Sequence, residues 1–178
     1  MTKDVFAAIF ERRSVRSFTH QEVPLATVTR LLEAAAAAPS AGNVQPWKFF
    51  VVEDADTRKE LARAALNQTW MADAPVVIVV CADLARAEKT YGERGRTLYA
   101  LQDTAAAAQN ILLGATALGL GTCWVGAFNE RMVAAVFDLE TQLLRPVAMI
   151  PLGHPAKTAK APARRPAEDI MSIIKGGS

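Results

Sequence analysis

Three arginines and a serine fall close together at the end of an apolar segment: Arg12, Arg13, Ser14 and Arg16. An arginine fork matches the oxygens of a phosphate in planar, bidentate geometry, and hydroxyl groups complete the shell. Basic side chains at this place could equally form a solvated turn that the dipole of a preceding helix favours. The residues alone leave both interpretations open, a phosphate site and a basic helix end.

A second polar group follows in the loop of residues 39–47. This loop offers the neutral side chains of Ser40, Asn43 and Gln45 beside Pro39 and Trp47. A planar heteroaromatic ring needs this mixture, with apolar faces against its plane and hydrogen-bond donors and acceptors along its edge. The more common use of such residues is a tight turn whose side chains satisfy their own backbone. Here too, both interpretations stay open.

Motifs for other kinds of chemistry are missing or misplaced. The sequence contains no G-x-S-x-G elbow, no P-loop and no H-E-x-x-H, and its only imidazoles are His20 and His154. The G-L-G at residues 119–121 begins like a dinucleotide fingerprint, but it follows an expected helix and precedes an expected strand, the reverse of the required order. We interpret it as a helix end and tight turn. If the chain is an enzyme, we expect a bound cofactor to carry the demanding step.

The composition is that of an ordinary globular domain. The chain has 178 residues, 51% of them hydrophobic, with 20 Lys+Arg against 18 Asp+Glu. One domain over residues 1–178 is the default at this length. The near-balance of charge argues against a nucleic-acid partner. Cys81 and Cys123 lie in apolar runs without further ligands at metal spacing, so we expect buried thiols and no metal site.

Two segments bear on location. Residues 1–10 lack the basic start and long apolar run of a signal peptide, so we expect a cytoplasmic protein. Residues 104–128 carry no charge and could cross a bilayer by length, but Gly119 and Gly121 interrupt them and Gln109 and Asn110 lie in their first half. We therefore expect a buried helix followed by a buried strand, and no membrane partner.

Hydrophobic periodicity outlines the elements that must position the polar groups. We expect helices at about 4–13, 28–38, 57–65, 98–118 and, with Asn129 as N-cap, 130–137, and strands at 47–52, 75–81, 122–126 and 147–152. The strand at 75–81 is apolar throughout, which predicts the centre of the sheet. The Pro- and Ala-rich tail from residue 155 cannot build a core of its own. Its apolar end at 170–174 suggests docking on a second subunit.

Five segments, taken in this order, resemble the flavin-dependent nitroreductase family. They are R-R-S-x-R-x-F at 12–18, P-S-x-x-N-x-Q-P-W at 39–47, A-P-V-V-I-V-V at 74–80, G-L-G-T-C-W-V-G at 119–126 and R-P-V-A-x-I-P-L-G at 145–153. Each segment is moderately specific by itself. Five in the right order are very hard to obtain by chance.

The resemblance implies an α+β fold with a central mixed β-sheet flanked by helices. It implies a homodimer with FMN in each of two interface sites and a C-terminal arm that crosses to the partner subunit. The expected activity is that of an NAD(P)H-dependent oxidoreductase: NADH or NADPH delivers a hydride to flavin N5 and leaves, and a small electron acceptor such as a nitroaromatic or quinone follows in ping-pong order. No catalytic side chain is then needed, because flavin N5 carries the chemistry.

The resemblance also assigns the phosphate end of the cofactor. Arg12, Ser14 and Arg16 would bind the FMN phosphate and ribityl chain, and Arg13 would contribute through its backbone or side chain. From the tail, Arg164 or Arg165 would complete the phosphate site.

The ring end involves two further segments and the polar loop. Asn67 would contact the ribityl chain, although Trp70 stands where relatives with that asparagine have a lysine. The strand end 124–127 would lie against the flavin, with backbone N–H groups near N5 from Trp124, Val125 and Gly126. The loop residues would reach ribityl and ring from the other subunit, and they are Pro39, Ser40, Asn43 and Gln45.

Alternatives remain open at this stage. The chain is compact for the family, and residues 83–97 are its only candidate lid. For the basic side chains of this stretch we favour a solvated loop over a site that attracts anionic substrates. The same fold supports dehalogenation, flavin fragmentation and dehydrogenation, among which fold and cofactor do not choose. A non-catalytic FMN-binding module is a further possibility, and an RNA-binding protein ranks well below it because aromatic and basic residues are not interleaved.

Overall fold

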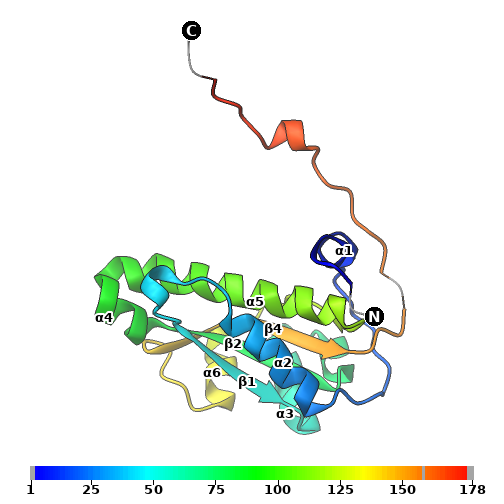
Figure 1. The fold of residues 1–178 in the computed structure, drawn as a ribbon. Helices are drawn as coiled ribbons and strands as arrows, with labels where there is room; N and C mark the ends of the chain where they lie inside the picture. The colour runs from blue at the N-terminus through cyan, green and yellow to red at the C-terminus, as the bar shows by residue number, and fades with distance from the viewer. Residues whose placement is uncertain (1–2, 158, 176–178) are drawn as a thin grey trace.

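A sheet with helices packed on both faces forms the body of the protein (Figure 1). The computed structural model describes residues 3–157 and 159–175. The sheet has the strand order β1-β2-β4-β3, with bounds β1 (Trp47–Val52), β2 (Val76–Asp83), β4 (Leu144–Gly153) and β3 (Gly121–Thr122). The expected α+β architecture is thereby confirmed, with the apolar strand β2 inside the sheet as predicted.

All pairings between these four strands are antiparallel. In the described part of the chain, the parallel component of the expected mixed sheet is a single isolated bridge, between Ser14 and Thr122 at the β3 edge. The sequence could not give strand direction, because each connection contains a helix and is long enough for either direction. The expected strand 122–126 is also shorter, since β3 ends at Thr122 and only Val125 pairs again, in a bridge to Met149.

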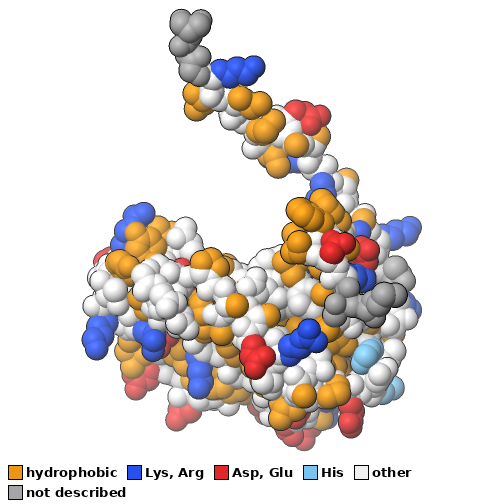
Figure 2. All heavy atoms as spheres, in the orientation of Figure 1, with side chains coloured by type: hydrophobic (Ala, Val, Ile, Leu, Met, Phe, Trp, Pro, Cys, Tyr) orange, Lys and Arg blue, Asp and Glu red, His pale blue; other side chains and the backbone are white. Residues whose placement is uncertain are grey.

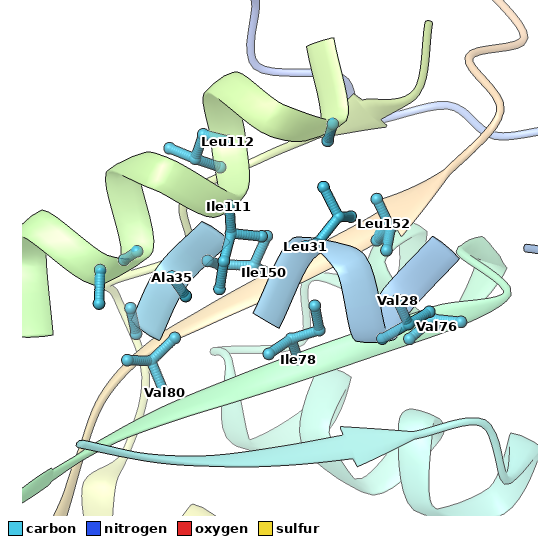
Figure 3. Packing of buried hydrophobic residues seen from close by; sticks show 14 of the residues in the cluster. Val28, Leu31, Ala35, Val76, Ile78, Val80, Ile111, Leu112, Ile150 and Leu152 are labelled. Carbon is cyan, nitrogen blue, oxygen red and sulfur yellow. The ribbon is translucent and has the colours of Figure 1, made fainter. Parts of the chain in front are cut away.

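Side chains alternate along β2, as they must in a strand. Val76, Ile78 and Val80 pack against α2 (Leu25–Ala36) and α5 (Ala100–Ala117), as Figure 3 shows from close by. The residues between them belong to a second core on the other face, with α3 (Ala55–Ala64) and α6 (Glu130–Val136). Because β2 is buried on both faces, its sequence is a continuous run of apolar residues.

Polar caps fix where several helices begin. The side chains of Asp4, Asp54 and Asn129 each accept a hydrogen bond from the backbone N–H three residues on, at the starts of α1 (Val5–Glu11), α3 and α6. Such a cap satisfies a donor that has no partner within the helix. The predicted cap at Asn129 is therefore confirmed. Helix α2 begins at Leu25, directly after Pro24 and before the first residue of its apolar pattern.

The expected solvated loop at 83–97 is wrong. These residues form α4 (Leu84–Arg94), which continues through a π-helical turn at Gly95–Tyr99 into α5. Leu84 and Ala87 bury an apolar face that the many charges of this stretch conceal in the sequence. The chain turns at Gly92, whose φ of 57° is left-handed and favours glycine.

Helix α1 and the tail project from the body (Figure 1). Among its described residues the tail contains one short 3₁₀ turn, Ala167–Asp169, and the apolar residues 170–174 form neither a helix nor a strand. Among the described residues, no helix has the length and apolar character needed to span a membrane. The charge-free stretch from residue 104 begins with most of the core helix α5 and continues into β3, as expected.

Candidate functional site

A basic cleft of about 490 Å³ lies where α1 ends. Hydrogen bonding of Val15 N–H to the Thr122 carbonyl, at 2.9 Å, holds the segment after α1 against the β3 edge. The tail passes over this segment and closes the other side of the cleft. No carboxylate is among the lining residues, which are Arg12, Arg13, Ser14, Arg16, Ala159, Lys160, Pro162 and Arg164.

The arginines of the cleft differ in how far their donors are already used. Arg13 Nη1 donates to the carbonyls of Phe10 at 2.6 Å and Arg12 at 2.8 Å, so its side chain braces the end of α1. Within the described ranges, the side chains of Arg12 and Arg16 form no ion pair and no hydrogen bond. Uncompensated guanidinium groups around one hollow favour a phosphate dianion.

The two adjacent arginines of the tail differ in what they contact. Arg164 lines the cleft, whereas Arg165 donates to the carbonyl of Asp169 at 2.6 Å and does not line it. The structure therefore separates two residues that the sequence could not distinguish. Sequence reasoning missed Lys160, which lines the same cleft from the tail. The only signal for it was its charge, in a segment without any regular pattern.

A short segment after α3 contacts both the basic cleft and the chain that follows Val125. The guanidinium of Arg16 lies over the ring of Trp70, 5.8 Å from its centroid, which is cation–π geometry. Gln68 Nε2 donates to the carbonyl of Ala127 at 3.3 Å. Asn67, exposed and left-handed with φ 59°, directly precedes Gln68 in the chain. Sequence reasoning missed Gln68 because one glutamine in a turn carries no pattern.

The strand end after β3 presents backbone donors to the surface. Val125 exchanges two backbone hydrogen bonds with Met149, both 2.9 Å, so its amide is used within the sheet. Its neighbours Trp124 and Gly126 alternate to the other side and are exposed. In the described part of the chain their N–H groups have no backbone partner. Of the three amides expected near a flavin, two are thus available.

Trp124 and Gly126 line a hollow of about 270 Å³ against the first turns of α5. Its rim holds a bidentate ion pair, in which Arg145 donates from Nε and Nη2 to the two carboxylate oxygens of Glu130 at 2.9 and 2.7 Å. Hydrogen bonding to Arg145 holds the pKa of Glu130 below its usual value. The pair therefore stays charged and fixed at neutral pH.

Cys123, directly before Trp124, carries a buried thiol. Burial raises the pKa of its thiol, against the smaller opposing effects of Arg16 and Ser14 nearby. Burial also raises the pKa of Cys81 to about 12. Both cysteines are free and buried, as the sequence predicted. The described residues include no cluster of His, Cys, Asp or Glu suited to a metal ion.

The polar loop is built on left-handed backbone. Gly42, Asn43 and Gln45 have φ of 55°, 55° and 53°, a conformation that costs a residue other than glycine about 1–2 kcal/mol. Hydrogen bonds within the loop hold it: Gln45 N–H donates to Ser40 Oγ at 3.0 Å, and Gln45 Nε2 to Asn43 Oδ1 at 3.2 Å. Pro39 and Asn43 remain exposed. The loop is thus a tight turn held by its own hydrogen bonds, as one of the two interpretations predicted. The exposed side chains of Pro39 and Asn43 can still contact a ligand.

The polar loop and the end of α1 lie at opposite ends of one protomer (Figure 1), and the basic cleft is at the end of α1. The loop is bonded to Asp103 in the first turn of α5. The cleft lies beyond the other end of that helix, where Ser14 pairs with Thr122. The 18 residues of α5 span about 27 Å at 1.5 Å each. Within one protomer, Asn67 and the strand end 124–126 therefore lie on the side of the basic cleft. The polar loop of the same protomer does not reach that cleft.

Comparison with known proteins decides the family. The sequence profile described as "Nitroreductase family" matches residues 9–69 and 63–154, which is most of the chain. The chain belongs to the nitroreductase family. Among the relatives of this nitroreductase-family chain is the "Putative NADH dehydrogenase/NAD(P)H nitroreductase" of Methanothermobacter thermautotrophicus, which is 36% identical over 86% of this chain and 78% of that protein.

Two further similarities cover nearly the whole nitroreductase-family chain. The "NADH dehydrogenase" of Thermus thermophilus is 31% identical over 94% of this chain and 95% of its own length. The structure of "NADPH:FMN oxidoreductase from Vibrio harveyi complexed with NAD+" superposes with a TM-score of 0.87 and 26% identity, over 99% of this chain and 78% of that one. The resemblance seen in the sequence motifs is therefore confirmed at the level of family and fold.

The residues of this nitroreductase-family protein fit the flavin nucleotide that the family resemblance implies. The cleft offers guanidinium groups without carboxylate partners, which suits the phosphate. The exposed amides of Trp124 and Gly126 suit the acceptor edge of a ring. The segment of Gln68 and Trp70 contacts both regions, since Trp70 lies under the Arg16 guanidinium and Gln68 donates to the carbonyl of Ala127.

Proposed function

We propose that the protein is an FMN-dependent oxidoreductase that takes a hydride from NADH or NADPH and passes electrons to a small acceptor such as a nitroaromatic or a quinone. The observation that carries this proposal is the basic cleft with Arg12 and Arg16 uncompensated, in a chain of the nitroreductase family. The names of the relatives support the same activity, since they are an NADH dehydrogenase and an NADPH:FMN oxidoreductase. When bound, FMN would supply the capacity to accept a hydride and to pass its two electrons, together with a proton, to the acceptor.

The chain itself would bind and orient the cofactor. Arg12, Ser14, Arg16 and Arg164 would hold the phosphate, with Arg13 bracing the end of α1 and Arg165 outside the contact. Asn67 would contact the ribityl chain. The N–H groups of Trp124 and Gly126 would donate to the ring near N5, and Val125 would hold that strand end through its pair with Met149. Backbone donors aimed at a ring that gains negative charge on reduction favour the reduced form.

We propose further that the site is completed across a homodimer. The loop residues Pro39, Ser40, Asn43 and Gln45 would come from the partner subunit, because one protomer separates them from its own cleft by the length of α5. The unpartnered apolar surfaces support an assembly: on α1, Phe6 is 67% exposed and Phe10 71%. A stripe of this kind is rare on a monomer.

The tail supplies the second apolar surface. Ile170, Ile173 and Ile174 are exposed, and Figure 2 shows apolar side chains gathered along the tail and around α1. An extended segment with apolar side chains and no core gains stability only by packing on another surface. We propose that it crosses to the partner subunit. Cytoplasmic placement belongs to the same proposal, because both cysteines are free thiols, as is usual in a reducing compartment.

Steady-state kinetics test the proposed function. With FMN-loaded protein, varying NADH or NADPH at several fixed concentrations of a quinone or nitroarene is expected to give parallel double-reciprocal lines, because reductant and acceptor use one site in turn. The control is the same assay with free FMN at equal concentration. Turnover no faster than that of free FMN would contradict the enzyme and favour a binding module. Intersecting lines would contradict the ping-pong order.

A further inference from the structure

Asp103 is a buried carboxylate that the proposed chemistry does not use. It lies in the first turn of α5 and is only 8% exposed. On the same face of the helix, one and two turns further on, Ala107 and Ile111 belong to the core between α5, α2 and the sheet. An acidic residue that merely complements the helix dipole would lie in solvent, where its charge costs nothing. The burial of Asp103 therefore calls for a specific partner.

The partner is the backbone of the polar loop. Both carboxylate oxygens of Asp103 accept from the N–H of Ala41, at 3.3 and 3.2 Å. In the described part of the chain this is its only hydrogen-bond partner. The contact joins residues 62 positions apart, so it ties the loop to the core helix rather than shaping the loop locally. Ala41 begins the turn that leads into the left-handed residues Gly42, Asn43 and Gln45.

Two side chains of α4 also contact the loop, at residues other than Ala41. Arg86 Nε donates to the carbonyl of Val44 at 2.5 Å. The side chain of Tyr91 lies so close to Gly42 that a Cβ there would be 2.2 Å from the tyrosine hydroxyl. Arg86 and Tyr91 are themselves exposed on α4, whereas Asp103 is anchored in the core. Asp103 is thus the rigid end of the attachment.

We propose that Asp103 is a positioning residue for the cofactor site: by holding the N–H of Ala41, it sets the polar loop in the conformation in which its side chains reach the ring bound by the partner subunit. This inference rests on the proposed function. Asp103 does not touch the cofactor and acts only through the loop. What matters is an acceptor fixed at this place, not the negative charge.

Two substitutions separate acceptor from charge. Asp103→Asn keeps the shape and one acceptor oxygen, and Asp103→Leu keeps the bulk without an acceptor. Hydrogen exchange of the Ala41 amide is measured in the protein without FMN, and in the Leu variant we expect this exchange to be at least tenfold faster. In the same variant we expect the Kd for FMN to rise at least tenfold. In the Asn variant we expect both values within about threefold of the wild type, because an amide oxygen still accepts. Thr116→Val, a buried hydroxyl removed from the far end of α5, is the matched control and should change neither.

A variant on the loop side keeps the test decisive if Asp103→Leu does not fold. Ala41→Pro removes the N–H while suiting the first position of a turn, and the extended backbone of Ser40, with φ −141° and ψ 152°, tolerates a following proline. We expect it to weaken FMN binding as Asp103→Leu does. Wild-type FMN affinity in Ala41→Pro, or in a folded Asp103→Leu, or loss of affinity in Asp103→Asn, would overturn the inference. Wild-type protein that binds no FMN would instead overturn the proposed function, and the exchange rate of Ala41 would still report on the Asp103 contact.

Discussion

A protein with both Arg12 and Arg16 replaced by alanine is expected to bind FMN about a hundredfold to ten-thousandfold more weakly than the wild type. Each side chain would form charge-assisted hydrogen bonds to the phosphate, and such bonds contribute about 1.5–3 kcal/mol each. Among the described residues neither guanidinium has a hydrogen-bond or ion-pair partner that its loss would leave unpaired, and Arg16 contacts only the ring face of Trp70. The effect should therefore fall on the ligand and not on the fold. Fluorescence titration of FMN with the protein gives the Kd.

Two controls isolate the phosphate contact. Riboflavin has the same ring and ribityl chain but no phosphate, so the double variant should bind it as the wild type does. Arg165→Ala removes an arginine from the same tail that bonds the carbonyl of Asp169 and lies outside the cleft. It should leave the Kd for FMN unchanged. Equal loss of riboflavin and FMN binding would show that the two arginines stabilise the protein rather than bind the phosphate.

Mixed dimers are expected to recover FMN binding from two inactive subunits. One subunit carries Arg12→Ala and Arg16→Ala, and the other carries Asn43→Gly and Gln45→Gly, which remove the loop side chains while glycine tolerates the left-handed backbone. Each homodimer should bind almost no FMN. If the loop serves the partner's cleft, the mixed dimer contains one site made wholly from intact parts. Flavin content should then rise from near zero to about one FMN per mixed dimer.

The reciprocal arrangement gives the opposite result and guards against a general effect of mixing. When one subunit carries all four substitutions and its partner is wild type, every shared site contains one defective half, so the mixed dimer should bind almost no FMN. A site built within a single subunit would behave in the reverse way, with one FMN in this second dimer and none in the first. Two differently tagged chains, purified through both tags, provide the mixed species.

The elements of the sheet and its core could be predicted because their patterns are local. The strand at Trp47–Val52 matches its predicted bounds, and the continuous apolar run of β2 gave its central place, since only a strand covered on both faces is apolar throughout. The cap at Asn129 follows from a side chain that hydrogen-bonds its own helix start. These features depend on residues close together in sequence.

What could not be predicted depends on tertiary contacts or on weak patterns. The pairing of the strands is antiparallel because of where each connection leads, which no single strand encodes. The helix α4 is polar on its outer face, and only Leu84 and Ala87 mark its buried side. Its charges therefore suggested a loop.

The candidate site divides in the same way. The arginines near α1 were visible as a cluster, whereas Lys160 and Gln68 reach the site only through folding. Asp103, in an alanine-rich helix 62 residues from its partner, gave no sign in the sequence. The amide of Val125 was expected to face a ligand, but the bridge to Met149 uses it, and strand alternation leaves the amides of its neighbours.

The proposed oxidoreductase activity is tested most directly by the absorption spectrum of the FMN-loaded protein between about 300 and 600 nm, recorded without oxygen before and after addition of NADH or NADPH. We expect flavin bands that bleach within the time of mixing and return when a quinone or nitroarene is added. Flavin bands that persist with both nicotinamides would contradict an NAD(P)H-driven oxidoreductase. Failure to retain FMN after reconstitution would contradict the cofactor itself.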